Sequence, residues 1–163
     1  MSSPYRIDER SITEHLLELA QQGNQPFTQR LHPDIAGVLG VRLPNLRALA
    51  RRIVRSGSWP AYLAEAEREE RPREEDFMEV RTLQGLVLGM LPVGDFSDYL
   101  LHLSRWVRVI HSWSVCDSFS LPQPKKLLRE GLKNCTSVRA LVPLALMAYT
   151  KCMRKSVDGA GKV

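Results

Sequence analysis

Apolar residues recur along most of this chain at intervals of three and four, the spacing that places them on one face of an α-helix. No segment shows the alternation of apolar and polar residues that predicts a half-buried strand. The sequence therefore predicts an all-α fold, in which each apolar stripe is covered by another helix. The clearest stripes are Leu46, Leu49, Ala50, Ile53 and Val54, and then Phe96, Tyr99, Leu100, Leu103, Val107 and Ile110.

Local signals mark where several of these helices begin. Ser11 and Glu14 have the spacing of a capping box, Pro44 suits a first helical turn, and Ser58 suits an N-cap. Predicted helices of about 12–18 residues with short links favour antiparallel helix pairs, as in an α-solenoid. We expect one helical domain over residues 1–150, followed by a frayed tail over 151–163.

The charge of the chain is mildly basic and unevenly distributed. Its 23 Lys and Arg residues against 18 Asp and Glu give a formal net charge of +5, which fits a polyanionic partner. Acidic residues gather in 65–79, and we interpret the charge run over 65–75 as an exposed helix end and loop. Three widely spaced cysteines do not predict a disulfide framework, so we expect a reducing, cytoplasmic location. No apolar run is long enough to span a bilayer, and a monomer without a membrane partner is expected.

Residues 110–119 (Ile-His-Ser-Trp-Ser-Val-Cys-Asp-Ser-Phe) combine one acid with several apolar side chains. Asp117 follows Trp113 by four residues, so a helix would present both side chains on one face. An ionised carboxylate is costly to bury without a partner. Two interpretations follow: Asp117 is a structural cap or ion-pair member beside a core Trp113, or it is an active-site acid beside an aromatic wall.

Three arginines, Arg47, Arg51 and Arg55, repeat every four residues next to the apolar stripe of their predicted helix. They form either a solvated face partly neutralised by the acidic segment or a ridge that contacts phosphates. Further along the chain, Lys125 and Lys126 belong to a second basic segment.

The sequence contains few signals for metal or cofactor chemistry. It has no Gly-rich phosphate loop, no His-Glu-x-x-His and no Cys-x-x-Cys. His111 and Cys116 are five residues apart and share a helical face poorly, and Cys116 is interpreted as a small packing residue. We therefore predict no metal and no cofactor.

Three stretches in register resemble the AlkD-like DNA alkylation repair glycosylases. They are residues 40–51 (Gly-Val-Arg-Leu-Pro-Asn-Leu-Arg-Ala-Leu-Ala-Arg), residues 79–89 (Glu-Val-Arg-Thr-Leu-Gln-Gly-Leu-Val-Leu-Gly) and residues 113–119 (Trp-Ser-Val-Cys-Asp-Ser-Phe). In the third stretch the family carries a Trp and an Asp at this same spacing. The resemblance covers roughly residues 10–120, with a weaker echo after Val138.

The resemblance implies a HEAT-like α-α superhelix whose concave basic face holds duplex DNA. It implies excision of positively charged N-alkylated purines, such as 3-methyladenine and 7-methylguanine, with Asp117 and Trp113 as catalytic residues. Arg139 would match a family Arg that helps to hold DNA near the acid. Members of the family are described as acting without flipping the base, unlike most glycosylases.

This chain also departs from the family pattern. The residues before Trp113 are His111 and Ser112, where the family often has Asp-Asn, and family members are longer. The alternative is therefore a shortened, non-catalytic HEAT-like scaffold that binds nucleic acid or a protein partner. An Asp117 packed in the interior against an Arg would favour the scaffold. An Asp117 that faces the same groove as the three arginines would favour the enzyme.

Overall fold

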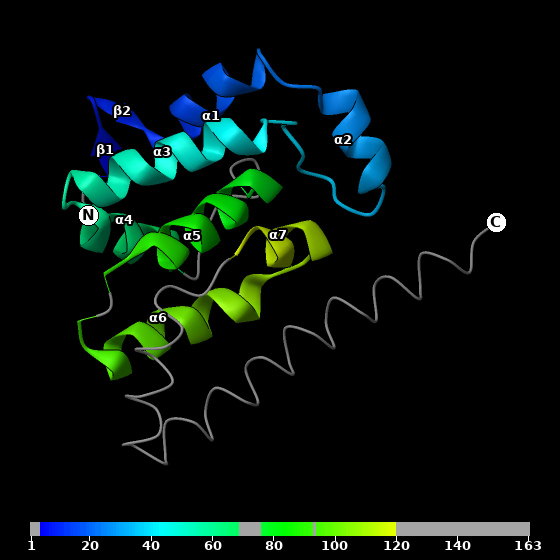
Figure 1. Ribbon diagram of the computed structural model, residues 1–163. Coiled ribbons are helices and arrows are strands. Elements are labelled where there is room, and N and C mark those ends of the chain that lie inside the picture. The colour runs from blue at the N-terminus through cyan, green and yellow to red at the C-terminus, as the bar shows by residue number, and fades with distance from the viewer. Residues whose placement is uncertain (1–3, 69–75, 93, 120–163) are drawn as a thin grey trace.

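The computed structural model describes residues 4–68, 76–92 and 94–119, with the backbone alone at residues 96 and 113. Nearly all regular structure in this part of the chain is helical, which confirms the predicted all-α class (Figure 1). No helix within these ranges is both long and apolar enough to cross a membrane. The helices are α1 (Ile12–Ala20), α2 (Gln25–Leu31), α3 (Leu43–Arg55), α4 (Trp59–Ala66), α5 (Met78–Met90), α6 (Phe96–Val109) and α7 (Trp113–Ser118).

Several sequence predictions concern residues outside these ranges. They are the basic segment with Lys125 and Lys126, the helix expected over 137–149 with Arg139, and the frayed tail over 151–163.

Helix α5 is the centre of the fold. In Figure 1 it lies between α3 and the pair formed by α6 and α7, and it also contacts α1 and α4. Every residue from Met78 to Leu88 is buried, so this helix has no solvent face. The buried residues are mostly apolar, and the polar ones among them include Glu79, Arg81 and Gln84. Because α3 and α7 lie on either side of α5, residues far apart in sequence meet at its first turn.

Glycine at position 85 allows α6 to approach α5 closely. A Cβ on Gly85 would lie 2.3 Å from Cζ2 of Trp106. The Trp106 indole is buried, donates its Nε1–H to the Arg81 carbonyl oxygen at 2.8 Å, and packs against Phe119. Trp106 was not among the residues that the sequence pattern assigned to the apolar face of this helix.

The predicted helix starts are confirmed at two positions and need a correction at a third. The capping box of Ser11 and Glu14 is complete, and Pro44 lies in the first turn of α3. Ser58 occupies the N-cap position of α4, but its hydroxyl makes no capping hydrogen bond. It bonds instead to the Tyr5 hydroxyl at 2.7 Å, because that ring packs over the start of α4.

A short hairpin before α1 was not expected from the sequence. Strands β1 (Arg6–Ile7) and β2 (Arg10–Ser11) pair antiparallel, and the two turn residues, Asp8 and Glu9, have φ values of 49° and 65°. Positive φ at both positions is the geometry of a two-residue hairpin turn. Strands of two residues are too short to show the alternation of apolar and polar residues by which a strand is recognised in a sequence. Tertiary contacts hold the hairpin instead, including an ion pair between Asp8 and Arg52.

Glu67, in the acidic segment, is less exposed than its place in a charge run suggested. The side chain of Glu67 is only 5% exposed and accepts hydrogen bonds from His102 at 2.6 Å and Arg105 at 2.7 Å. The interpretation of this residue as part of an exposed helix end is therefore wrong. Its burial follows from α6, which passes beside the end of α4 and supplies both partners.

Candidate active site

The stretch around Asp117 forms helix α7. Ser112 is the N-cap, and its Oγ accepts a hydrogen bond from the Ser114 amide at 3.2 Å. Asp117 is exposed and makes no ion pair or hydrogen bond with another described residue. It is therefore neither a helix cap nor a buried ion-pair member within the described ranges. The backbone places Trp113 one turn earlier on the same helix.

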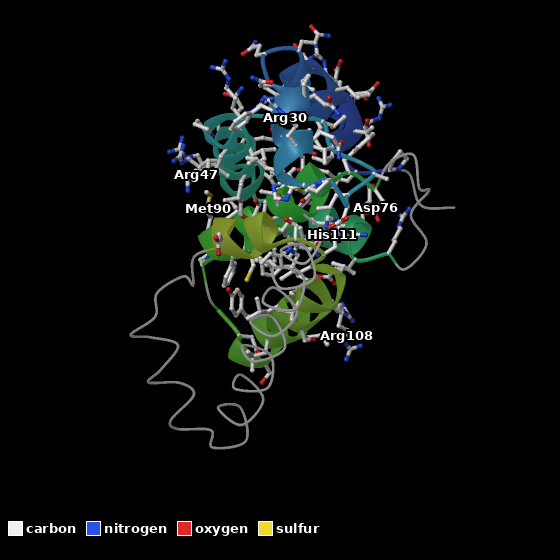
Figure 2. All side chains as sticks on the ribbon, turned by 90° about the vertical axis from the view of Figure 1, so that its right-hand side faces the viewer. Arg30, Arg47, Asp76, Met90, Arg108 and His111 are labelled. Atoms are coloured by element: carbon white, nitrogen blue, oxygen red, sulfur yellow. The ribbon has the colours of Figure 1, made fainter. Side chains whose placement is uncertain are left out.

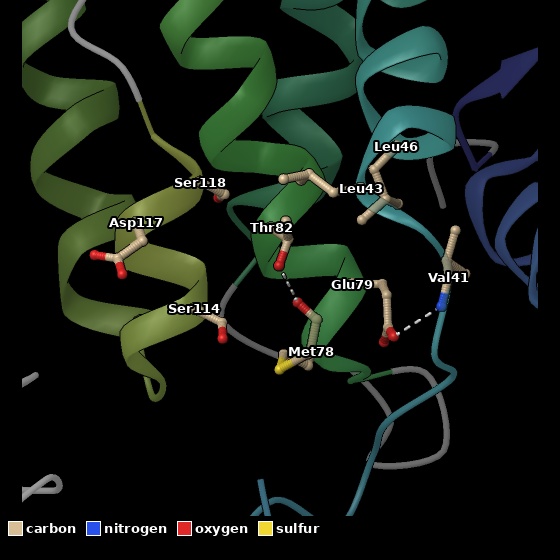
Figure 3. Close-up of a pocket in the computed structure, with 9 residues that line it drawn as sticks. All are labelled: Val41, Leu43, Leu46, Met78, Glu79, Thr82, Ser114, Asp117 and Ser118. Atoms are coloured by element: carbon tan, nitrogen blue, oxygen red, sulfur yellow. Dashed lines mark hydrogen bonds between the residues drawn. The ribbon is translucent and has the colours of Figure 1, made fainter. Parts of the chain in front are cut away.

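A pocket of about 270 Å³ lies between the first turns of α3 and α5 and one side of α7 (Figure 3). Apolar side chains form much of its wall, and hydroxyl groups and two carboxylates complete it. In Figure 3 the Asp117 carboxylate lies at the outer side of α7 and points away from Glu79. The lining residues are Val41, Leu43, Leu46, Met78, Glu79, Thr82, Ser114, Asp117 and Ser118.

The carboxylate of Glu79 is fixed by backbone amides of the segment that precedes α3. Glu79 is 1% exposed, and its Oε1 accepts from the amides of Gly40 at 2.6 Å and Val41 at 3.3 Å. The Leu39 amide lies 3.1 Å from both oxygens. Gly40 has a φ of +77°, and a Cβ there would lie 2.4 Å from backbone atoms of Gln25, so only glycine fits. Three backbone N–H donors therefore fix the position of this buried carboxylate.

The pocket has an acidic lining. Glu79 and Asp117 both border it, and no Lys, Arg or His is among its lining residues in the described part of the chain. A carboxylate charge exerts a stronger field where little water screens it. Such a pocket favours a cationic ligand over a neutral one of the same shape.

His32, which the sequence analysis did not single out, connects the segment before α3 to α7. Its ring is buried, with Nε2 2.8 Å from the Ser114 Oγ and Nδ1 3.4 Å from the Ser112 Oγ. Burial lowers the pKa of His32 below its ordinary value, and the nearby Glu79 carboxylate opposes that shift. No periodicity marks this residue, because its partners are 80 and 82 positions away along the chain.

The three arginines of α3 are exposed on a face that begins at the pocket. Leu43 lines the pocket, and Arg47, Arg51 and Arg55 follow it at intervals of four, so the row continues along the same side of the helix. Figure 2 shows Arg47 pointing outward from the body of the molecule.

The acidic segment does not neutralise this row within the described residues. Glu65, Glu67, Asp76 and Glu79 bind other partners, and Arg47, Arg51 and Arg55 have no ion pair with a described acid. The neighbouring Arg52 differs, because it pairs with Asp8 of the hairpin.

No group of three or more possible metal ligands occurs among the residues that the structure describes. Cys116, in α7, is a free and partly exposed thiol. The other two cysteines lie outside the described ranges.

Comparison with known proteins identifies the family of the chain. The family model described as DNA alkylation repair enzyme matches residues 12–136, a span that includes α1 through α7. No curated protein matches the chain, and neither does any solved structure. Because the match extends over more than half of the sequence, the resemblance noted above is confirmed, and this chain belongs to the family of DNA alkylation repair enzymes.

Proposed function

We propose that this protein is a DNA glycosylase that removes positively charged N-alkylated purines, such as 3-methyladenine and 7-methylguanine, from duplex DNA. The observation that carries the proposal is the acidic lining of the pocket, which includes Glu79 and Asp117 and no basic side chain among the described residues. An N-alkylated purine is a cation, whereas an unmodified base is neutral. The pocket therefore favours the lesion over the normal base through its field.

The chemistry of such a lesion suits an exposed carboxylate. The bond between the base nitrogen and the sugar C1′ breaks, and its electron pair neutralises the charge on the departing base. No general acid is needed for this step. The sugar becomes oxocarbenium-like, and water then adds to C1′ and gives up a proton. We assign Asp117 to stabilise the sugar cation and to orient and deprotonate this water.

The two carboxylates have different roles in this proposal. The oxygens of Glu79 already accept backbone N–H groups, so Glu79 contributes charge rather than proton transfer. Asp117 has no such partners among the described residues and remains available to a ligand. Trp113, one turn away, is assigned to the cationic base or sugar, where an aromatic face contributes about 0.5–2 kcal/mol.

The arginine row supplies the affinity for DNA in this proposal. Arg47, Arg51 and Arg55 extend from the pocket along α3 and are assigned to phosphates of the duplex. Lys125, Lys126 and Arg139 are assigned to the same role on sequence grounds. We propose that a HEAT-like superhelical domain formed by residues 1–150 presents these groups to one side of the duplex, and that the protein acts as a monomer in the cytoplasm.

The direct test is release of free methylated base from a methylated duplex by the purified chain. The expected result is release of 3-methyladenine and 7-methylguanine, with none from an unmodified duplex of the same sequence. Asp117→Asn should abolish most of the release and leave binding to unmodified DNA unchanged. Binding without release by the unmutated chain would reject the glycosylase and indicate a nucleic-acid-binding scaffold.

A further inference from the structure

The segment between α2 and α3, residues 32–42, is fixed at several points and is here named the connecting segment. Near its start, Gln29 donates hydrogen bonds to the carbonyl oxygens of His32 at 3.0 Å and Ile35 at 2.8 Å. In its middle, the Gly37 carbonyl oxygen accepts from the Met78 amide at 2.8 Å. Toward its end, three amides bind the Glu79 carboxylate. The segment therefore belongs to the rigid frame of α5.

The first residue of this segment reaches a different helix. His32 contacts two hydroxyl groups of the α7 region, with the shorter contact, 2.8 Å, to the Ser114 Oγ. The longer contact is to Ser112, whose hydroxyl also caps α7. A side chain of the connecting segment thus touches the cap and the first turn of the helix that carries Asp117.

Helix α7 depends on such contacts for its position. It has six residues, and a helix of that length is not stable in water without tertiary contacts. Its fully buried apolar side chain is Val115, and Cys116 and Phe119 also pack against the core. Apolar contacts have little directional preference, whereas a hydrogen bond one residue away from Val115 is directional and limits rotation of the helix.

We propose that His32 is a positioning residue for Asp117, and that it acts by holding Ser112 and Ser114 and so fixing the rotation of α7 against the frame of α5. Ser114 and Asp117 are three residues apart and line the same pocket, so a rotation that moves one also moves the other. The claim that His32 affects catalysis rests on the proposed glycosylase function. The claim that His32 fixes the rotation of α7 does not depend on that function.

The neutral form of the imidazole suits this role. A neutral ring has one donor and one acceptor nitrogen, so it can bond two hydroxyl groups in complementary directions. Burial already favours that form. The charged groups that border the same pocket are Glu79 on α5 and Asp117 on α7, and both are negative when ionised.

The test uses amide hydrogen exchange, measured by mass spectrometry on peptides that cover α7, and it does not require activity. His32→Ala should accelerate exchange in residues 112–118 about tenfold, because local opening becomes easier, and should leave α3 unchanged. His32→Gln, which retains a donor and an acceptor, should restore part of the protection. The matched control is His15→Gln, since His15 is also buried but bonds to the Ile7 carbonyl oxygen at 2.9 Å.

A second variant keeps the test decisive if His32→Ala does not fold. Ser114→Ala removes the shorter hydrogen bond without disturbing the ring and should accelerate exchange in the same peptide. Unchanged exchange in Ser114→Ala and in His32→Gln, or equal acceleration by His15→Gln, would overturn the proposal.

Activity measured on the same variants separates this inference from the proposed function. If the chain releases methylated base, His32→Ala should lower kcat about tenfold or more with little change in KM, because DNA still binds the arginine row. A kcat that equals that of the unmutated protein would reject the catalytic consequence. An inactive unmutated chain in which the variants still loosen α7 would reject the glycosylase and leave the mechanical role intact.

Discussion

Glu79 and Asp117 border one pocket from two helices, but only Asp117 is exposed. Glu79 is 1% exposed and its oxygens accept backbone N–H groups, whereas the Asp117 side chain lies at the surface of α7. One carboxylate is thus built into the frame of the pocket, and the other is open to a ligand. This difference gives the two residues separable mutant phenotypes.

Asp117→Asn should reduce base release without reducing stability. The substitution keeps the shape of the side chain but removes the charge that a sugar cation needs, which typically costs about 2.7–4 kcal/mol, or roughly a hundred- to a thousandfold in rate. The rate of release under single turnover and Tm are measured on the same preparation. Asp98→Asn, in an exposed acid of α6 outside the pocket, is the control and should change neither quantity. Full activity in Asp117→Asn would end the catalytic assignment.

Glu79→Gln should reduce stability instead. A Gln carbonyl oxygen can replace Oε1, which all three amides contact, but the amide nitrogen of Gln would then face the Leu39 N–H in the place of Oε2. The remaining hydrogen bonds would also lose the charge of the carboxylate, which makes them weaker. The free energy of unfolding should fall by about 1.5–3 kcal/mol, as measured by urea denaturation. Glu18→Gln, which removes an exposed acid paired with Arg10, should change it by less than about 0.5 kcal/mol. Equal effects of the two substitutions would contradict this account of Glu79.

Arg47→Ala, Arg51→Ala and Arg55→Ala should each weaken DNA binding for all sequences alike. The slope of log Kd against log salt concentration should become shallower by about one unit for each phosphate contact that is lost. Fluorescence anisotropy across a salt series measures that slope. Arg52→Ala is the matched control on the same helix, because Arg52 pairs with Asp8, and its slope should equal that of the unmutated protein. Slopes that stay the same in all three variants would remove α3 from the DNA interface.

Gly85→Ala should destabilise the fold through the contact with Trp106. The added methyl group would lie 2.3 Å from Cζ2 of the indole, so the ring or the helix must shift, which costs about 1–3 kcal/mol. Chemical denaturation followed by Trp fluorescence measures the loss. Gly94→Ala is the control, since a Cβ there would meet no atom within 4 Å. A Gly85→Ala variant as stable as the control would show that α6 does not pack this closely.

The free energy of unfolding should fall as the pH is lowered from about 6.5 toward the pKa of His32 in the folded protein. In this range the unfolded chain binds a proton at His32 and the folded protein does not. The pKa of His32 is lowered in the folded state, so below about pH 6.5 the unfolded chain binds the proton more readily. The free energy of unfolding therefore decreases with acidification until the folded pKa is reached, and His32 contributes no pH dependence well above 6.5. Urea midpoints at about pH 7.5 and about pH 5.5 should differ less in His32→Gln than in the unmutated protein. If the urea midpoint shifts equally between the two pH values in His32→Gln and in the unmutated protein, His32 is not the source of the pH dependence.

The helical class followed from local patterns. Helix periodicity relates residues that are three and four positions apart in sequence. The apolar stripe from Leu46 to Ile53 and the spacing of Trp113 and Asp117 are both patterns of this local kind. The capping box at Ser11 is local in the same sense and was found for the same reason.

The parts that sequence reasoning missed depend on contacts between distant residues. His32 meets Ser114 across 82 positions, and Glu79 meets Gly40 across 39, so neither contact leaves a periodic trace. Glu67 was placed at the surface because charge runs are usually solvated, whereas α6 covers it. The pocket is formed by contacts between residues that are far apart in sequence. Its lining residues therefore could not be derived before the positions of α3, α5 and α7 were known.

The lack of a solvent face on α5 also constrains the order in which the chain can fold. A nascent chain that ends before α6 exposes the side of α5 on which Trp106 packs, and its apolar residues have nothing there to cover them. Stable structure in the first 92 residues is therefore expected only after α6 and α7 have left the ribosome. The chain then folds after most of it has been synthesised. Ribosome-bound chains that end before α6 should be sensitive to protease, and resistance should appear in one step once α6 and α7 are available.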